Sequence, residues 1–85
     1  MSAQKGMHPE LIKAQIRMRG KTLTQLALEN KLSPTAVAAA LRKPMLSGEK
    51  AIASFLGLPP YLIWPDRWTQ DGQRVRPRYR YKYNF

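Results

Sequence analysis

The 85-residue sequence contains no cysteine and a single histidine, His8. A disulfide framework and a thiolate zinc site are therefore excluded, and one imidazole cannot hold a metal ion alone. Acidic residues are also scarce, since the five Asp and Glu are scattered along the chain and offer no nucleophile with its base. A glycine-rich phosphate-binding loop is missing as well. These absences argue against an enzyme and predict neither a metal nor a cofactor.

Long apolar runs are equally absent. No stretch approaches the ~18 apolar residues of a membrane-spanning helix, and the first ten residues lack the apolar core of a secretory signal. A basic helix lying on a membrane surface is disfavoured, because the apolar positions are needed for a core. We therefore expect a soluble protein of the cytoplasm.

Positive charge is abundant. Fifteen Lys and Arg against five Asp and Glu give a formal net charge of +10. Long-range electrostatics concentrate such a protein on polyanions, of which nucleic acid is the first candidate.

Helical periodicity and stop signals divide the chain into short helices. A chain of this length fits one small domain, and we expect an all-α architecture of four to five helices over residues 8–68. A leader of residues 1–7 and a basic, tyrosine-rich tail of residues 69–85 flank it. The predicted helices cover residues 9–19, 22–29, 34–42, 48–56 and one or two turns within 58–64. The first should bury an apolar stripe of Leu11, Ile12, Ile16 and Met18.

Helix starts are indicated by capping residues. Thr22 and Gln25 have the spacing of a capping box, in which each side chain accepts from the other residue's backbone N–H. Ser33 is expected to cap the next helix, with Pro34 as its first residue. Ser47 is expected to cap the helix over 48–56.

Two further expectations concern Glu49 and the residues after the last predicted helix. Glu49 should lie near the positive end of the helix over 48–56. Residues 69–73 read as a polar linker, with a turn at Asp71-Gly72.

The two helices over 22–29 and 34–42 match the helix-turn-helix plan. Ala27 supplies the small residue needed where the helices cross, and Leu32 supplies an apolar side chain in the turn. Val37 and Leu41 lie four apart, as inward-facing residues of a helix do.

Three further runs carry a family resemblance: ALRKP over 40–44, GEKAIA over 48–53 and IWPDRW over 63–68. With them, residues 8–68 resemble the Ner-like regulators of transposable, Mu-type bacteriophages, within the lambda-repressor-like helix-turn-helix domains. The run IWPDRW is similar to IWPSRY in that family. The resemblance implies a small DNA-binding protein that represses or modulates transcription. Two positions depart from the pattern, Lys31 in place of Gly and Ala39 in place of a polar residue, and the resemblance implies a positive φ at Lys31.

Base contacts are expected from the second helix of the motif, which enters the major groove in such proteins. Ala38 and Ala39 should contact thymine methyls and Thr35 should make one polar contact, so that DNA shape carries much of the recognition. Arg42 is a candidate for either a base or a phosphate. The predicted exposed positions are Ser33, Pro34, Thr35, Ala38, Ala39 and Arg42.

Phosphate contacts are expected around the start of the first helix of the motif. Thr24 and Gln25 lie there, although Gln25 cannot serve equally as a cap and as a contact. Basic residues supply the remaining candidates, which are Arg17, Arg19, Lys21, Lys43 and Lys50.

The C-terminal run RVRPRYRYKYNF alternates basic residues with apolar or aromatic ones, and Pro77 interrupts it. Three interpretations stay open. The tail is an arm that stacks tyrosines on nucleic acid, a strand that pairs two copies into a dimer, or a segment that docks Trp68 and the tyrosines onto its own domain. The first interpretation adds four DNA-binding candidates, Arg76, Arg78, Arg80 and Lys82.

The sequence therefore predicts a sequence-specific, repressor-type regulator that binds double-stranded DNA. A homodimer, formed before or only upon DNA binding, is compatible with this function. Two alternatives are a sequence-tolerant nucleic-acid-binding protein acting through charge and the tail, and a protein-interaction module.

Overall fold

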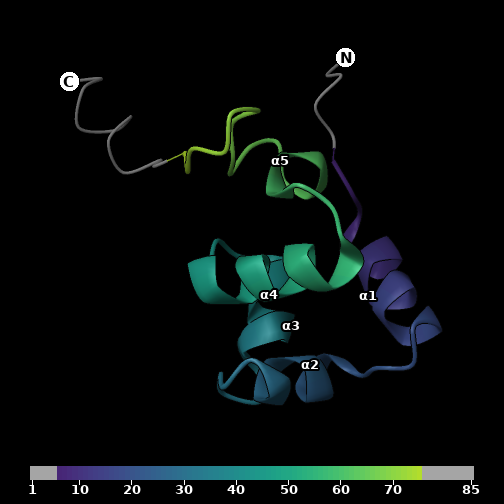
Figure 1. The fold of residues 1–85 in the computed structure, drawn as a ribbon. Coiled ribbons are helices and arrows are strands. Elements are labelled where there is room, and N and C mark those ends of the chain that lie inside the picture. Colours follow the sequence, from purple (N-terminus) through teal and green to yellow (C-terminus); the bar gives the residue numbers. More distant parts are fainter. Residues whose placement is uncertain (1–5, 76–85) are drawn as a thin grey trace.

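A computed structural model describes residues 6–75, which form five helices and one isolated β-bridge. Helix α3 lies between α2 and α4, α1 packs against α2 and α4, and α5 contacts α4 (Figure 1). The all-α prediction is confirmed. The helices are α1 (Pro9–Met18), α2 (Leu23–Glu29), α3 (Ala36–Arg42), α4 (Leu46–Leu56) and α5 (Pro60–Ile63).

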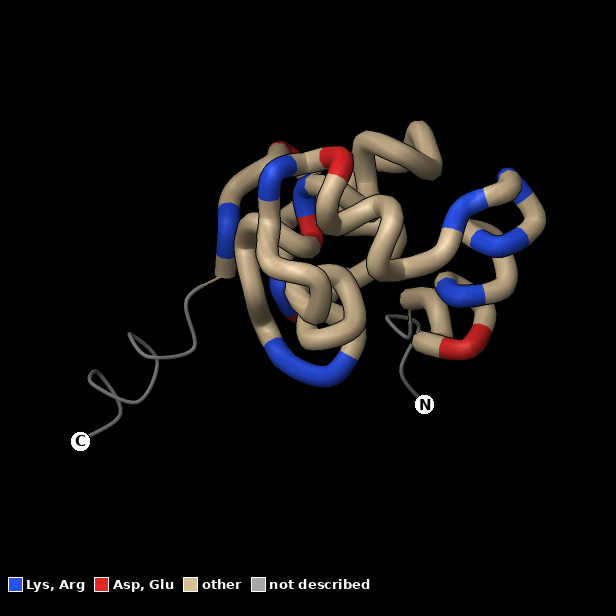
Figure 2. Tube along the Cα trace, turned by 90° about the horizontal axis from the view of Figure 1, so that it is seen from below, with Lys and Arg blue, Asp and Glu red and all other residues tan. Residues whose placement is uncertain are grey.

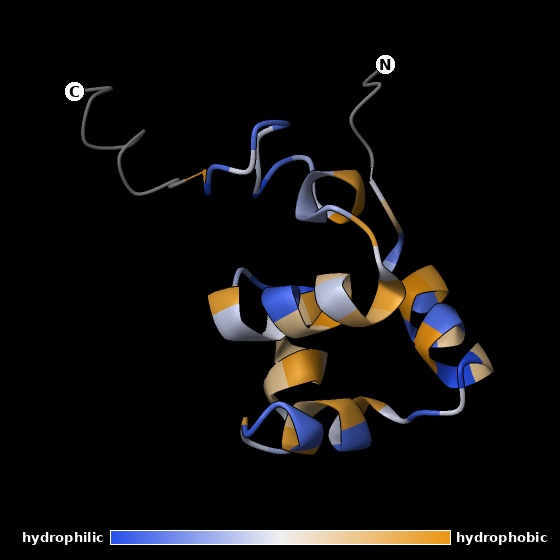
Figure 3. Ribbon diagram, in the orientation of Figure 1, coloured by the Kyte–Doolittle hydropathy of each residue, from blue (hydrophilic) through white to orange (hydrophobic). Residues whose placement is uncertain are grey.

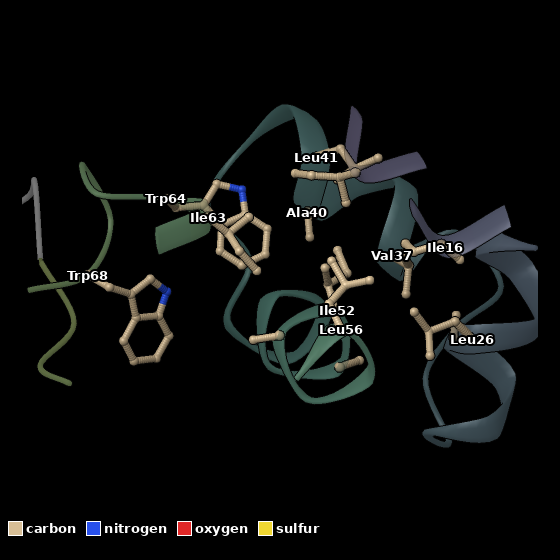
Figure 4. Close-up of a cluster of buried hydrophobic side chains, with 14 residues drawn as sticks. Ile16, Leu26, Val37, Ala40, Leu41, Ile52, Leu56, Ile63, Trp64 and Trp68 are labelled. Atoms are coloured by element: carbon tan, nitrogen blue, oxygen red, sulfur yellow. The ribbon is translucent and has the colours of Figure 1, made fainter. Parts of the chain in front are cut away.

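The helices share one buried apolar cluster. Figure 3 shows apolar residues on helix sides that face other helices, and Figure 4 shows Ile52 and Leu56 of α4 among side chains from the other helices. No helix among residues 6–75 is long and apolar enough to cross a membrane. The labelled members of the cluster are Ile16, Leu26, Val37, Ala40, Leu41, Ile52, Leu56, Ile63, Trp64 and Trp68.

The apolar stripe predicted for α1 is narrower than expected. Ile12 and Ile16 are fully buried, whereas Leu11 and Met18 are 47% and 77% exposed. Because residues four apart lie on the same side of a helix, the Ile12–Ile16 pair alone defines the side that meets the core. The prediction that Leu11 and Met18 are buried is therefore wrong.

Of the three predicted caps, the one at Thr22 is confirmed, and those at Ser33 and Ser47 are wrong. The capping box is present, since Thr22 Oγ1 accepts from the Gln25 N–H at 3.0 Å and Gln25 Oε1 accepts from the Thr22 N–H at 2.8 Å. Helix α3 begins at Ala36, and neither Ser33 nor its N-cap residue Thr35 caps it with a side chain. Ser33 and Pro34 belong instead to the preceding turn.

Helix α4 begins at Leu46, two residues before the predicted start, so that Ser47 lies inside its first turn. The N-cap residue is Met45, whose backbone N–H donates to Glu49 Oε2 at 2.8 Å. The prediction that Ser47 caps this helix is therefore wrong, and the side chain that bonds at the helix start is Glu49, which accepts from the N-cap N–H.

Helices α3 and α4 approach each other closely at Gly48. A Cβ at this position would lie 2.6 Å from the Ala36 carbonyl oxygen and 2.7 Å from the Ala40 Cβ. Both distances are shorter than atomic packing permits, so the crossing requires glycine on α4 and small residues on α3.

Glu49 is fully buried and accepts four hydrogen bonds. One comes from the Met45 N–H, and the other three come from residues beyond α5. Trp68 Nε1 donates to Oε1 at 2.9 Å, whereas Arg67 Nη1 and Arg74 Nη2 donate to Oε2 at 2.9 and 3.3 Å. A buried carboxylate is tolerated only with such donors, because burial removes its hydration.

Residues 67–75 form a short hairpin that supports this cluster. Trp68 and Arg74 make an antiparallel bridge, and the Val75 N–H donates to the Arg67 carbonyl at 2.8 Å. The turn predicted at Asp71-Gly72 is confirmed, with Gly72 at φ +88°. The predicted linker, residues 69–73, is thus the loop of a hairpin that packs on the domain.

The N-terminal leader also contacts the domain over its last described residues. The Met7 N–H donates to the Ile63 carbonyl at 3.1 Å. A Cβ on Gly6, which has φ +70°, would lie 2.4 Å from Pro65 Cδ. Residues 6 and 7 are therefore packed beside the end of α5.

We expect Gly48→Ala to lower the free energy of unfolding by about 1–3 kcal/mol, because the added methyl group overpacks the α3–α4 crossing. Ser47→Ala is the matched control and should change it by less than about 0.5 kcal/mol, since Ser47 is exposed and caps nothing. Urea unfolding followed by circular dichroism measures both. A loss of about 1 kcal/mol in Ser47→Ala would reinstate Ser47 as the cap, and an unchanged Gly48→Ala would contradict the close crossing.

We expect Arg67→Met to lower the free energy of unfolding by about 3 kcal/mol, because the buried Glu49 keeps Arg74 but loses its closer arginine, and the Ala40 carbonyl loses its donor. Arg17→Met, on the exposed side of α1, should cost less than about 0.5 kcal/mol. Thermal and urea unfolding, followed by tryptophan fluorescence, compare the two variants. Equal stabilities would show that Glu49 does not depend on Arg67.

Candidate nucleic-acid interface

Helices α2 and α3 and the turn between them form the predicted helix-turn-helix arrangement. Ala27 is fully buried at the crossing, and its carbonyl accepts from the Leu32 N–H at 3.0 Å, which closes the turn. Lys31 has φ +61°, as the family resemblance implied for this turn position. The side chains of Val37 and Leu41 point into the core (Figure 4).

The capping box determines how Gln25 is oriented at the start of α2. Its Oε1 atom accepts from the Thr22 N–H. Its side-chain nitrogen, Nε2, donates no hydrogen bond within residues 6–75. Thr24 and Gln25 are both exposed. The carbonyl end of the Gln25 side chain therefore serves the helix, while the –NH₂ end remains available as a donor.

The surface of α3 differs from the prediction at one position. The exposed residues are Ser33, Pro34 and Thr35 before the helix and Arg42 at its end, while Ala38 is half-buried. Ala39 is only 8% exposed, so its prediction as an exposed contact is wrong. The physical reason is that α3 packs between α2 and α4, and an alanine methyl group is too short to project beyond that packing.

The predicted phosphate-binding residues lie mostly on the surface. Arg17, Arg19 and Lys43 are exposed, and so is Lys50 of α4. Figure 2 shows basic positions along α1 and the turn that follows it. Lys21 differs, because its Nζ forms an ion pair with Glu29. The remaining candidates lie outside the described residues, and they are Arg76, Arg78, Arg80 and Lys82.

The sequence did not reveal that Arg67 reaches the end of α3. Arg67 Nη1 donates to the Ala40 carbonyl oxygen at 2.6 Å as well as to Glu49. Its guanidinium carbon also lies 5.3 Å from the centre of the Trp64 ring. An Arg side chain thus satisfies one of the last carbonyls of α3, which have no partner within the helix. The only local signal was an arginine beside two tryptophans.

Arg74 completes the cluster from the far strand of the hairpin. Its guanidinium lies 5.4 Å from the Trp68 ring and donates to Glu49. The sequence had placed Arg74 in the tail, apart from the domain. Docking of Trp68 onto its own domain is confirmed, since Trp68 is buried, and the tail tyrosines lie outside the described residues.

Comparison with known proteins agrees with this geometry. A family described as winged helix-turn-helix DNA-binding matches residues 6–80. Sugar fermentation stimulation protein B of Escherichia coli K12 is 39% identical over 61 residues, which are 72% of this chain and 66% of that protein. The chain thus spans about two thirds of the length of this relative.

Two phage-related proteins match as well. The negative regulator of transcription of Escherichia phage D108 is 39% identical over 61 residues, or 72% of this chain and 84% of that protein. The Mu-like prophage FluMu DNA-binding protein Ner of Haemophilus influenzae is 29% identical over 80 residues, or 94% and 90%. The resemblance to Ner-like regulators is confirmed, and the chain belongs to the winged helix-turn-helix DNA-binding family.

Proposed function

We propose that this protein is a sequence-specific DNA-binding regulator of transcription that acts as a repressor. The observation that carries the proposal is the α2–turn–α3 arrangement, with its capped first helix, closed turn and exposed residues before and along α3. A net charge of +10 supports DNA as the partner, because cationic surfaces accumulate on phosphate.

In this proposal α3 enters the major groove, with its N-terminal end near the base edges. Ser33, Pro34 and Thr35 precede the helix, and Ala38 offers a methyl group to a thymine. Arg42 lies later and contacts a base or a phosphate. Among these residues only Arg42 can form a bidentate contact with a base, so most of the sequence preference comes from DNA shape.

Phosphate contacts fix the orientation of the protein on the duplex. Gln25 is the best-defined candidate, because its cap directs the carbonyl inward and leaves the amide nitrogen as a donor. Thr24 lies beside it on the surface, where its hydroxyl group is a second candidate to donate to a phosphate. The further candidates are basic residues, namely Arg17, Arg19, Lys21 and Lys43.

Relatives support the regulatory part of the proposal. One is named a negative regulator of transcription and another a DNA-binding protein, whereas a third is named for stimulation of sugar fermentation. We assign repression to this chain, acting in the cytoplasm of a bacterial or phage-infected cell, where the DNA lies. The protein binds as a two-fold homodimer, which implies half-sites about 10 bp apart or a multiple of that spacing.

We also propose that the basic tail, from Arg76 onward, adds contacts to phosphate. The contacts of residues 74 and 75 determine where a variant without the tail must end. Ending it at Gln70 would remove Arg74 and Val75, which contact Glu49 and Arg67, and would confuse tail binding with destabilisation. A chain that ends at Val75 keeps these contacts.

We expect duplexes selected from a random pool to bind roughly 10³-fold more tightly than scrambled duplexes of equal composition, the lower edge for specific regulators. Fluorescence anisotropy from low to physiological salt measures this ratio. The chain ending at Val75 should keep the ratio and show a shallower salt dependence, because the tail's phosphate contacts are gone.

Three outcomes contradict parts of this proposal. Equal affinities for selected and scrambled duplexes, falling together with salt, would indicate a sequence-tolerant binder. Weak binding to every duplex, together with a stoichiometric protein partner, would indicate an interaction module. An unchanged salt slope for the chain ending at Val75 would remove the tail from the DNA contacts.

We expect Gln25→Glu to weaken binding to every duplex while preserving stability. The carboxylate keeps the acceptor for the Thr22 N–H and suits the first turn of a helix, but it lacks the N–H donor and repels phosphate. Anisotropy and thermal unfolding of the same samples measure the two effects. Unchanged affinity would show that Gln25 serves only as a cap, and lost stability would show that the acceptor was not preserved.

A further inference from the structure

A groove of about 600 Å³ runs beside the DNA-binding helix. Helix α1 lines it with Glu10 and Lys13, α2 with Leu23, and α3 with Ala38 and Arg42. Because Ala38 and Arg42 belong to the side of α3 proposed to face DNA, the groove is continuous with that side. It therefore extends the proposed interface from the helix-turn-helix onto the first turns of α1.

The charges of the groove suit a phosphate backbone. Lys13 and Arg42 contribute cations from two different helices. Leu23 provides apolar surface of the kind that contacts a deoxyribose. Arg42 forms no ion pair among residues 6–75, so its charge is uncompensated there.

Glu10 opposes these cations from within the same groove. Its Oε2 atom lies 3.1 Å from Lys13 Nζ, and its side chain is 71% exposed. The pair is thus accessible to solvent and weak. A phosphate that enters the groove competes with Glu10 for the Lys13 ammonium and is itself repelled by the carboxylate.

We propose that this groove is a second phosphate site, in which Lys13 and Arg42 bind the DNA backbone beside α3 and Glu10 limits the affinity. The inference rests on the proposed DNA-binding function and adds α1 to it. Glu10 thereby lowers the affinity for every duplex through charge, whatever its sequence.

Lys13→Gln tests the contact in the full chain. It should weaken binding to selected and scrambled duplexes by the same factor and reduce the magnitude of the salt slope by about 0.9, the value for one phosphate contact. An unchanged slope would overturn the assignment of Lys13.

Glu10→Gln and Asp66→Asn form a matched pair, since each removes one exposed negative charge and only Glu10 lines the groove. Glu10→Gln should tighten binding to scrambled duplexes roughly threefold, the effect of one charge pair about 6 Å apart in water. The affinity of Asp66→Asn for scrambled duplexes should stay within about 1.5-fold of that of the parent chain, because Asp66 lies outside the groove and solvent ions screen its charge from a phosphate there. Equal effects of the two variants would overturn the role of Glu10.

The two proposals can fail separately. If the parent chain prefers selected duplexes while Lys13→Gln and Glu10→Gln leave binding unchanged, the groove proposal fails and the regulator proposal stands. If the parent chain shows no preference but both variants act as expected on scrambled DNA, the groove is a phosphate site of a sequence-tolerant binder. Circular dichroism of each variant confirms that the fold is kept.

Discussion

The buried carboxylate of Glu49 is the constraint on which the rest of the described structure depends. Without exposure to water it requires several hydrogen-bond donors, and three of its four come from residues 67–74. The chain after α5 must therefore fold back over the junction of α3 and α4. Arg67 then also reaches the Ala40 carbonyl near the end of α3. One acidic side chain thus sets the position of the hairpin, and Arg67 of that hairpin in turn bonds to the end of α3.

Close packing between α3 and α4 makes this arrangement possible and limits how α3 can read DNA. Gly48 meets Ala36 and Ala40 at the crossing, so α3 needs small residues on that side. Ala39 is buried as well, and Ala38 is half-buried, which leaves few hydrogen-bonding groups on α3 for base edges. Under the proposed function, the alanine-rich sequence that allows tight packing is also the feature that directs recognition toward DNA shape.

Local signals made the approximate helix positions and the capping box predictable, because each involves residues within a few positions of one another, whereas the positive φ of Lys31 was implied by the family resemblance. Ser33 and Ser47 misled for the same reason, since serine before proline or glycine suggests a cap whatever the tertiary structure requires. The exposure of Ala39 depended on how closely a neighbouring helix packs, which periodicity does not reveal. The Glu49 cluster joins residues 18, 19 and 25 positions apart, and no local pattern specifies such partners.

A strongly basic protein binds any duplex, so a regulator of this kind must gain its selectivity from how well one rigid surface fits one DNA shape. Arg67, which lies outside the helix-turn-helix itself, bonds to Ala40 near the end of α3 and to Glu49 of α4. In the proposed complex, an α3 free to tilt would adapt its few contacts to many sequences, and charge would then dominate binding. Under the proposed function, residues beyond the motif therefore contribute to recognition through the position of α3 and not through contact with DNA.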